Sequence, residues 1–207
     1  MPDKPGSTSL WYPFDRPLVL ASRSPRRHEI LSLAGIPHIV RPADVEEDNE
    51  ADSDPRELVA RHAGMKADAV SHEHPDSPVL GADTVVWLDG TILGKPSCEE
   101  EAVEMLSALS GRTHTVFGGV CLVRESPCFR REFVEATCVA FRALTPGEIR
   151  AYVSTGEPMD KAGAYGIQGF GSALVRRVEG CYFNVMGLPV ARVAEELKAA
   201  AAGACRC

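Results

Sequence analysis

One stretch decides how this chain begins to fold: Pro17-Leu18-Val19-Leu20-Ala21, followed at once by Ser22-Arg23-Ser24-Pro25-Arg26-Arg27. Its first half is a short apolar run of the kind that forms a buried strand. Ser24 is a suitable N-cap residue and Pro25 suits the first helical position, so a helix is predicted from there to Gly35, a C′ glycine. The sequence therefore predicts a strand, a tight loop and a helix that begins where the strand ends.

Two arginines, Arg26 and Arg27, fall in the first turn of that helix, where positive charge opposes the helix dipole. Stability alone does not explain them, so removing Arg27 is expected to leave thermal stability unchanged or slightly improved. Guanidinium groups match phosphate oxygens bidentately, and a helix N-terminus offers N–H groups to an anion. The two arginines therefore indicate either an anion site or an exposed face with two solvated side chains.

Composition places the 207-residue chain among soluble globular proteins, with 44% hydrophobic and 25% charged residues. A net charge of -7 argues against a protein that coats nucleic acid, and no apolar run approaches the roughly 20 residues of a membrane span. The seven cysteines show no metal-ligand spacing, so we expect a cytoplasmic protein without disulfides. Residues 1–16 lack the features of a signal peptide and are expected to form a flexible extension before one domain, residues 17–207.

Helix and strand patterns alternate along the rest of the chain. Strands are predicted at residues 38–41, 79–88, 91–93, 116–123, 133–141 and 174–178, with Asp89-Gly90 as a hairpin turn. Helices are predicted at residues 54–69, 97–109, 145–152 and 188–202. Ser97 with Glu100, and Thr145 with Glu148, have the spacing of capping boxes. This alternation predicts an α/β fold with a mixed sheet.

Asp83 interrupts the longest strand-like run, although a buried carboxylate is costly unless it is hydrogen-bonded, paired or bound to a metal. Asp83 is therefore either a structural residue that caps a turn, or a metal ligand and general base. The acidic pair Glu46-Glu47 supports the second interpretation, because it could supply a further carboxylate. Carboxylates alone favour Mg²⁺ or Mn²⁺ over zinc. Thr84 is expected on the opposite face of the strand.

Three further polar groups are candidates for ligand binding. Lys95 lies in the stiff turn Gly94-Lys95-Pro96. The helical pattern around Lys66 predicts that this residue lies on the polar side of its helix. Each is either a phosphate contact or a solvated lysine. Residues 160–171 form a glycine-rich polar loop without the spacing of a Walker or Rossmann motif. Its Gln168 could pair with a base edge through the side-chain amide, or the loop could be a plain turn.

Five stretches, taken in order, resemble the motifs of the Maf (septum formation protein) family: residues 21–27, 81–84, 94–96, 109–114 and 161–169. The resemblance covers residues 18–197. It implies a house-cleaning nucleoside triphosphate pyrophosphatase that releases a nucleoside monophosphate and pyrophosphate. The fold that it implies is an elongated mixed α/β sheet with two lobes and a cleft, similar to inosine triphosphate pyrophosphatase. It also implies a homodimer.

The resemblance implies a role for each residue that matches a motif position. Asp83 matches the catalytic acid, a general base linked to a divalent metal, Mg²⁺ or Mn²⁺, and Glu47 matches the acidic residue that shares this metal. The matches to the phosphate-binding set are Ser22, Arg27, Lys66 and Lys95. The matches to the base-selecting set are Arg26, Thr84 and Gln168, and they imply the branch that acts on dTTP and UTP.

Base discrimination by Gln168 requires a neighbour that fixes the orientation of its amide, and Arg26 is expected to be that neighbour. Two other hypotheses stay open on the sequence. One is a non-catalytic nucleotide sensor that regulates cell division, and the other is an interaction scaffold whose cations serve only surface pairs.

Overall fold

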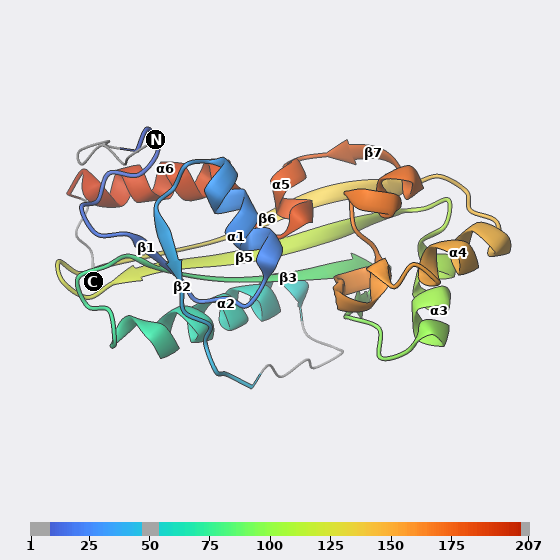
Figure 1. Ribbon diagram of the computed structural model, residues 1–207, viewed down its shortest axis with the longest axis horizontal. Coiled ribbons are helices and arrows are strands. Elements are labelled where there is room, and N and C mark those ends of the chain that lie inside the picture. The colour runs from blue at the N-terminus through green and yellow to red at the C-terminus, as the bar shows by residue number, and fades with distance from the viewer. Residues whose placement is uncertain (1–8, 47–53, 204–207) are drawn as a thin grey trace, which may run out of the picture.

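The computed structural model describes residues 9–46 and 54–203, which are built around a seven-stranded mixed sheet (Figure 1). Three strands run parallel, in the order β2 (His38–Val40), β1 (Leu18–Leu20) and β3 (Val79–Leu88). The sheet continues from β3 in antiparallel pairing through β5 (Thr113–Arg124), β6 (Phe129–Phe141) and β7 (Val175–Glu179). The short strand β4 (Thr91–Leu93) pairs with the far end of β3. The predicted α/β fold with a mixed sheet is confirmed.

Helices cover both faces of the sheet (Figure 1). The long helix α2 (Pro55–Ser71) lies on one face, and α1 (Pro25–Leu33), α5 (Tyr182–Met186) and α6 (Val190–Ala201) lie on the other. At one end of the molecule, α3 (Glu99–Leu109) and α4 (Pro146–Val153) pack together. Three short 3₁₀ segments follow α4 along the chain: Glu157–Asp160, Ala162–Ala164 and Gly169–Leu174.

The two largest hydrophobic cores lie toward opposite ends of the long strands. One gathers side chains of β1, α1 and α6, including Leu20, Ile30 and Leu197. The other gathers side chains of α3 and α4, including Leu106 and Tyr152. Strands β3 and β5 contribute to both cores, so the fold has two lobes on one continuous sheet, as expected.

Between the lobes, one edge of β3 is left uncovered by the strands that the structure describes. The pairing of β1 with β3 ends at Leu20 opposite Leu80, and the pairing of β4 with β3 begins only at Val86. The intervening backbone of β3 is paired on its other side with β5, where Asp83 lies opposite Gly119. Asp83 therefore sits at an opening in the sheet edge.

Two glycines on adjacent strands let α2 lie close to the sheet on the Asp83 face. A Cβ atom on Gly81 would lie 2.1 Å from the carbonyl oxygen of Ala63, and one on Gly119 would lie 2.2 Å from that of Val59. Any side chain at these positions would push the helix away. The close packing brings the residues of α2 that flank Ala63 down to Asp83.

Several local predictions need correction. The helix α3 has Cys98 as its N-cap without a side-chain bond, and both the N–H and the hydroxyl of Ser97 donate to Glu101, so the capping box with Glu100 is wrong. The capping box of Thr145 and Glu148 is confirmed. Strands β5 and β6 extend beyond their predicted bounds, and the five-residue helix α5 was not predicted.

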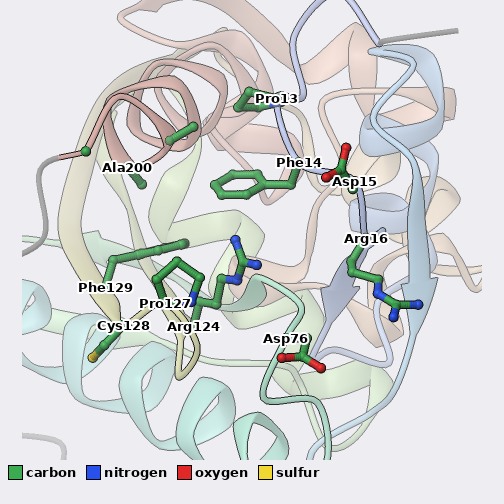
Figure 2. Close-up of a pocket in the computed structure, with 12 residues that line it drawn as sticks. Pro13, Phe14, Asp15, Arg16, Asp76, Arg124, Pro127, Cys128, Phe129 and Ala200 are labelled. Atoms are coloured by element: carbon green, nitrogen blue, oxygen red, sulfur yellow. The ribbon is translucent and has the colours of Figure 1, made fainter. Parts of the chain in front are cut away.

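The segment just before β1 packs on the domain, although the sequence suggests a flexible extension over residues 1–16. Tyr12 is 3% exposed and belongs to the first core. The ring of Phe14 stacks on that of Phe129, with centroids 5.8 Å apart, and the Arg124 guanidinium lies 5.3 Å from the Phe14 centroid (Figure 2). Residues 1–8 lie outside the described part of the chain.

The cysteines also differ from expectation. Cys98, Cys121, Cys138 and Cys181 are free, but Cys128 is disulfide-bonded, so the prediction of a chain without disulfides is wrong. Cys128 follows β5 and lines the same pocket as Ala200 at the end of α6 (Figure 2). Spacing along the sequence does not reveal that these two parts of the chain meet.

Candidate active site

A cleft of about 980 Å³ opens over the uncovered edge of β3. Both lobes contribute to it: the β1–α1 loop on one side, the Lys95 turn and the glycine-rich loop (residues 160–171) on the other. Seven residues that the sequence singled out line it together: Ser22, Arg26, Arg27, Lys66, Thr84, Lys95 and Gln168, in addition to Asp83. The ninth predicted site residue, Glu47, lies outside the described residues.

The Asp83 carboxylate forms the floor of the cleft and is held by two side chains of α2. Lys66 Nζ lies 2.8 Å from Oδ1, and His62 Nδ1 lies 3.1 Å from Oδ2. Lys66 and His62 are four residues apart, so they occupy one face of the helix. All three residues are buried, with His62 only 1% exposed. Both carboxylate oxygens are therefore fixed by partners that come from a single helix.

The surroundings of Asp83 stabilise its ionised form. Burial would raise the pKa of this carboxyl, but the hydrogen bond from His62 and the positive charges of Lys66 and Arg27 outweigh burial. The pKa is held well below its usual range as a result. Asp83 is thus a permanent negative charge at the floor of the cleft at any pH near neutrality.

Arg27 connects the two sides of the first lobe beneath the cleft. Its Nε donates to the carbonyl of Gly187 at 2.9 Å, Nη1 to the Ser22 hydroxyl at 2.9 Å, and Nη2 to the Thr84 hydroxyl at 3.1 Å. These contacts tie the β1–α1 loop to β3 and to the end of α5. Arg27 is 8% exposed, so the alternative of a solvated arginine is wrong for this residue.

Sequence reasoning placed Lys66 incorrectly and missed His62 as a site residue. Lys66 is 7% exposed and faces the sheet, whereas the pattern gave it to the polar side of its helix. The available clue was the spacing of His62 and Lys66, which parallels that of the small residues Ala63 and Ala67. A helix that packs closely on a sheet through small residues carries their neighbours into the interface with it.

The other three predicted site residues are more open to solvent. Lys95 and Gln168 are exposed, and Arg26 is half-buried. Arg26 Nη1 lies 2.8 Å from Asp160 Oδ2, and its Nη2 donates to the Asp160 carbonyl at 3.3 Å. This ion pair joins the start of α1 to the beginning of the glycine-rich loop across the cleft. Arg26 makes no hydrogen bond to Gln168 in the part of the chain that the structure describes.

A buried pair anchors the glycine-rich loop to the second core. The hydroxyl of Tyr165 lies 2.7 Å from His114 Nε2. His114 is 2% exposed, and burial lowers its pKa to about 4, so the imidazole is neutral at physiological pH. The loop is thereby fixed to β5 at one point just before the segment that carries Gln168.

This arrangement defines a class of site: a cleft between two lobes, with a charged floor of one carboxylate and two buried cations, suited to a phosphorylated ligand. The model of the Maf family, described as Maf-like protein, matches residues 17–200 of the chain. The chain therefore belongs to the Maf family.

Close relatives agree with this assignment. The chain is 49% identical over 183 residues to the dTTP/UTP pyrophosphatases of Bacillus mycoides (strain KBAB4) and Bacillus cereus (strain AH820), covering 88% of this chain and 95% of each relative. The dTTP/UTP pyrophosphatase of Bacillus anthracis is similar to the same extent. Among solved structures, the Ham1 protein of Staphylococcus aureus is similar with a TM-score of 0.46 and 16% identity, over 77% of this chain and 80% of that one.

Within residues 9–46 and 54–203, no helix has both the length and the apolar character that crossing a membrane requires.

Proposed function

We propose that this chain hydrolyses UTP and dTTP to the nucleoside monophosphate and pyrophosphate. One observation carries the proposal: Asp83 is held ionised by Lys66, His62 and Arg27 at the floor of a cleft that also has Lys95 and Gln168 on its walls. Relatives that are named dTTP/UTP pyrophosphatases support the choice of substrate, because they are 49% identical along nearly their whole length.

The charged floor suits the phosphate end of the substrate. Arg27 and Lys66 supply positive charge from buried positions, and Lys95 supplies it from an exposed turn. Charges that are fixed before the substrate arrives stabilise the charge that develops on the reacting phosphate without further reorganisation. Ser22 and Thr84, both bonded to Arg27, lie at the same end and offer hydroxyl groups. Asp83 is the group that we propose to accept the proton of the attacking water.

A divalent cation, Mg²⁺ or Mn²⁺, fits this donor chemistry. The described residues contain no group of three or more metal-binding side chains, so these residues alone do not make a closed metal site. Mg²⁺ is commonly held by one or two carboxylates together with substrate phosphates, and Asp83 supplies one such carboxylate. Glu47 is the proposed second carboxylate. When bound, the cation would neutralise phosphate charge and activate water.

The wall formed by the glycine-rich loop suits the base. The Gln168 amide can donate and accept at once, and the O4 and N3–H edge shared by uracil and thymine requires both. Cytosine presents the opposite pattern at this edge. We therefore propose that Gln168 favours UTP and dTTP over CTP. Arg26 and Thr84, which also line the cleft, are proposed to lie between the bound base and the phosphates. The homodimer that the family resemblance implies stays a prediction.

A turnover screen tests the proposal. The purified chain is incubated with Mg²⁺ and each of UTP, dTTP, CTP, ATP and GTP, and the products are separated by anion-exchange chromatography. The expected result is equal amounts of monophosphate and pyrophosphate, formed fastest from UTP and dTTP. Tight binding of UTP without turnover would favour the nucleotide sensor instead, and release of diphosphate with inorganic phosphate would contradict the proposed site of attack.

A further inference from the structure

We propose that Glu157 and Tyr152 are positioning residues that set the base preference of the cleft, because they fix the backbone segment that carries Gln168. This inference rests on the proposed function and deepens it. It assigns a role to two residues that the sequence did not predict as part of the site; Glu157 lines the cleft and Tyr152 lies in the second core behind it.

Gln168 itself is not fixed through its side chain. Its amide makes no hydrogen bond with any described residue, and the side chain is exposed at the cleft wall. Arg26, the neighbour expected to orient it, is bound to Asp160 instead. The position of the amide in the cleft therefore depends on the backbone from Gly166 to Gly171.

Glu157 holds this backbone from one side. Its Oε2 accepts the N–H of Phe170 at 2.9 Å, and its Oε1 accepts the N–H of Gly171 at 3.0 Å. Burial would raise the pKa of this carboxyl, but the two backbone N–H groups lower it below its usual value. Glu157 is thus an ionised acceptor for the two residues that follow the turn at Gly169.

Tyr152 connects the same carboxylate to the start of the segment. Its hydroxyl donates to Glu157 Oε1 at 2.9 Å and accepts the N–H of Gly166 at 3.1 Å. Tyr152 is 6% exposed and belongs to the second core. The carboxylate and the phenol therefore bind the segment at both ends, Gly166 on one side and Gly171 on the other, with Gln168 between them.

The segment also packs closely against the two side chains that hold it. Gly169 has φ of +65°, and a Cβ atom there would lie 2.5 Å from Glu157 Oε2. A Cβ atom on Gly171 would lie 2.2 Å from the carbonyl oxygen of Gly166 and 2.7 Å from the Tyr152 hydroxyl. The loop backbone therefore contacts both Glu157 and Tyr152 closely, and a substitution of either side chain should change the position of Gln168.

A glutamine cannot replace Glu157 without loss. Both carboxylate oxygens accept a backbone N–H, and an amide offers only one oxygen, so its NH₂ group would face a backbone N–H. Glu157→Gln therefore keeps the shape but breaks one anchor of the segment. Tyr152→Phe removes the hydroxyl that joins Gly166 to the carboxylate and leaves the ring in the core.

The test measures kcat/KM for UTP and for CTP in the wild type, Glu157→Gln and Tyr152→Phe. The expected result is a fall in the UTP-to-CTP ratio of about tenfold in Glu157→Gln and a smaller fall in Tyr152→Phe. The matched control is Glu148→Gln, which alters a carboxylate of similar bonding on the same lobe, in the capping box of α4, without touching the loop. The control should keep the wild-type ratio.

A double variant separates positioning from a general loss of structure. If Glu157 acts through Gln168, then Glu157→Gln added to Gln168→Ala should leave the ratio of the Gln168→Ala enzyme unchanged. An unchanged ratio in both Glu157→Gln and Tyr152→Phe would overturn the inference, as would multiplicative effects in the double variant. Absence of UTP hydrolysis, or equal rates with UTP and CTP, in the wild type would overturn the proposed function as well, so the two failures are distinguishable.

Discussion

The floor of the cleft and its glycine-rich wall are built in opposite ways. On the floor, charged side chains hold one another: Asp83 binds His62 and Lys66, and Arg27 binds Ser22 and Thr84. On the wall, Gln168 is exposed and unbonded among the described residues, while the backbone around it is held by Glu157. Side chains are fixed in the first region, and backbone is fixed in the second.

The difference indicates how each region contributes. The charges of the floor are buried and bonded to one another, so they exert the same electrostatic field on every substrate. They can therefore increase the rate of hydrolysis but cannot distinguish one base from another. A wall that presents one amide on a fixed backbone discriminates by the hydrogen bonds that a base can make. Substitutions in the floor should therefore change turnover and stability together, and substitutions in the wall should change selectivity.

The largest effect is expected for Asp83→Asn. Loss of the negative charge removes the proposed metal ligand and proton acceptor, so turnover of UTP should fall about a thousandfold or more. The free energy of unfolding should also fall, by about 3–5 kcal/mol, because buried Lys66 loses an ionised partner 2.8 Å away. Steady-state kinetics and urea unfolding measure the two losses.

The control for that substitution is Asp89→Asn, an exposed aspartate just past the end of β3 that pairs with Arg112. It should keep both turnover and stability near wild type. Wild-type kcat in Asp83→Asn would remove the catalytic assignment.

The next effect concerns the stability of the chain without Arg27, which the sequence led us to expect to be unchanged or slightly improved. Arg27→Ala should destabilise the chain by about 4 kcal/mol, because three hydrogen bonds from a buried guanidinium are lost. Lys95→Ala, at an exposed position, should raise KM for UTP and leave the melting temperature unchanged. Thermal unfolding compares the two. A melting temperature of Arg27→Ala equal to that of Lys95→Ala would show that Arg27 does not hold the floor together.

A smaller effect is predicted for the pH dependence of stability, and it comes from His114, which anchors the glycine-rich loop through Tyr165. His114 has a pKa of about 4 in the folded chain and an ordinary value of 6.5 when unfolded, so the unfolded chain binds the proton first as pH falls. Stability should decrease between pH 6.5 and pH 4 by up to about 3 kcal/mol from this residue. Chemical unfolding of the wild type and of His114→Gln across this interval isolates the contribution. Parallel curves for the two proteins would exclude it.

Local patterns predicted much of the fold. Apolar runs located β1 and β3, and Ser24 with Pro25 located the start of α1. The helix α5 escaped prediction because it has only five residues and its N-cap, Cys181, makes no side-chain bond. The cap of α3 shifted by one residue because Glu101, rather than Glu100, reaches back to Ser97.

The site was predicted by motif but not in its internal contacts. Of the residues expected in one cleft, those that the structure describes do line it, and Glu47 lies outside the described part. The burial of Lys66 depends on Gly81 and Gly119, which are distant from it in sequence and allow α2 to approach the sheet. Likewise, the partners of Arg27 include Gly187, 160 residues further along the chain. Hydrophobic periodicity and secondary-structure propensity describe one segment at a time. They therefore do not predict contacts that arise when distant segments pack closely together.

The most direct test of the contrast between floor and wall measures kcat/KM for UTP and CTP in Asp83→Asn and Gln168→Ala. Asp83→Asn should lower both values by the same factor and leave their ratio unchanged. Gln168→Ala should lower the ratio by about tenfold, chiefly through slower hydrolysis of UTP. A changed ratio in Asp83→Asn, or an unchanged one in Gln168→Ala, would contradict the account.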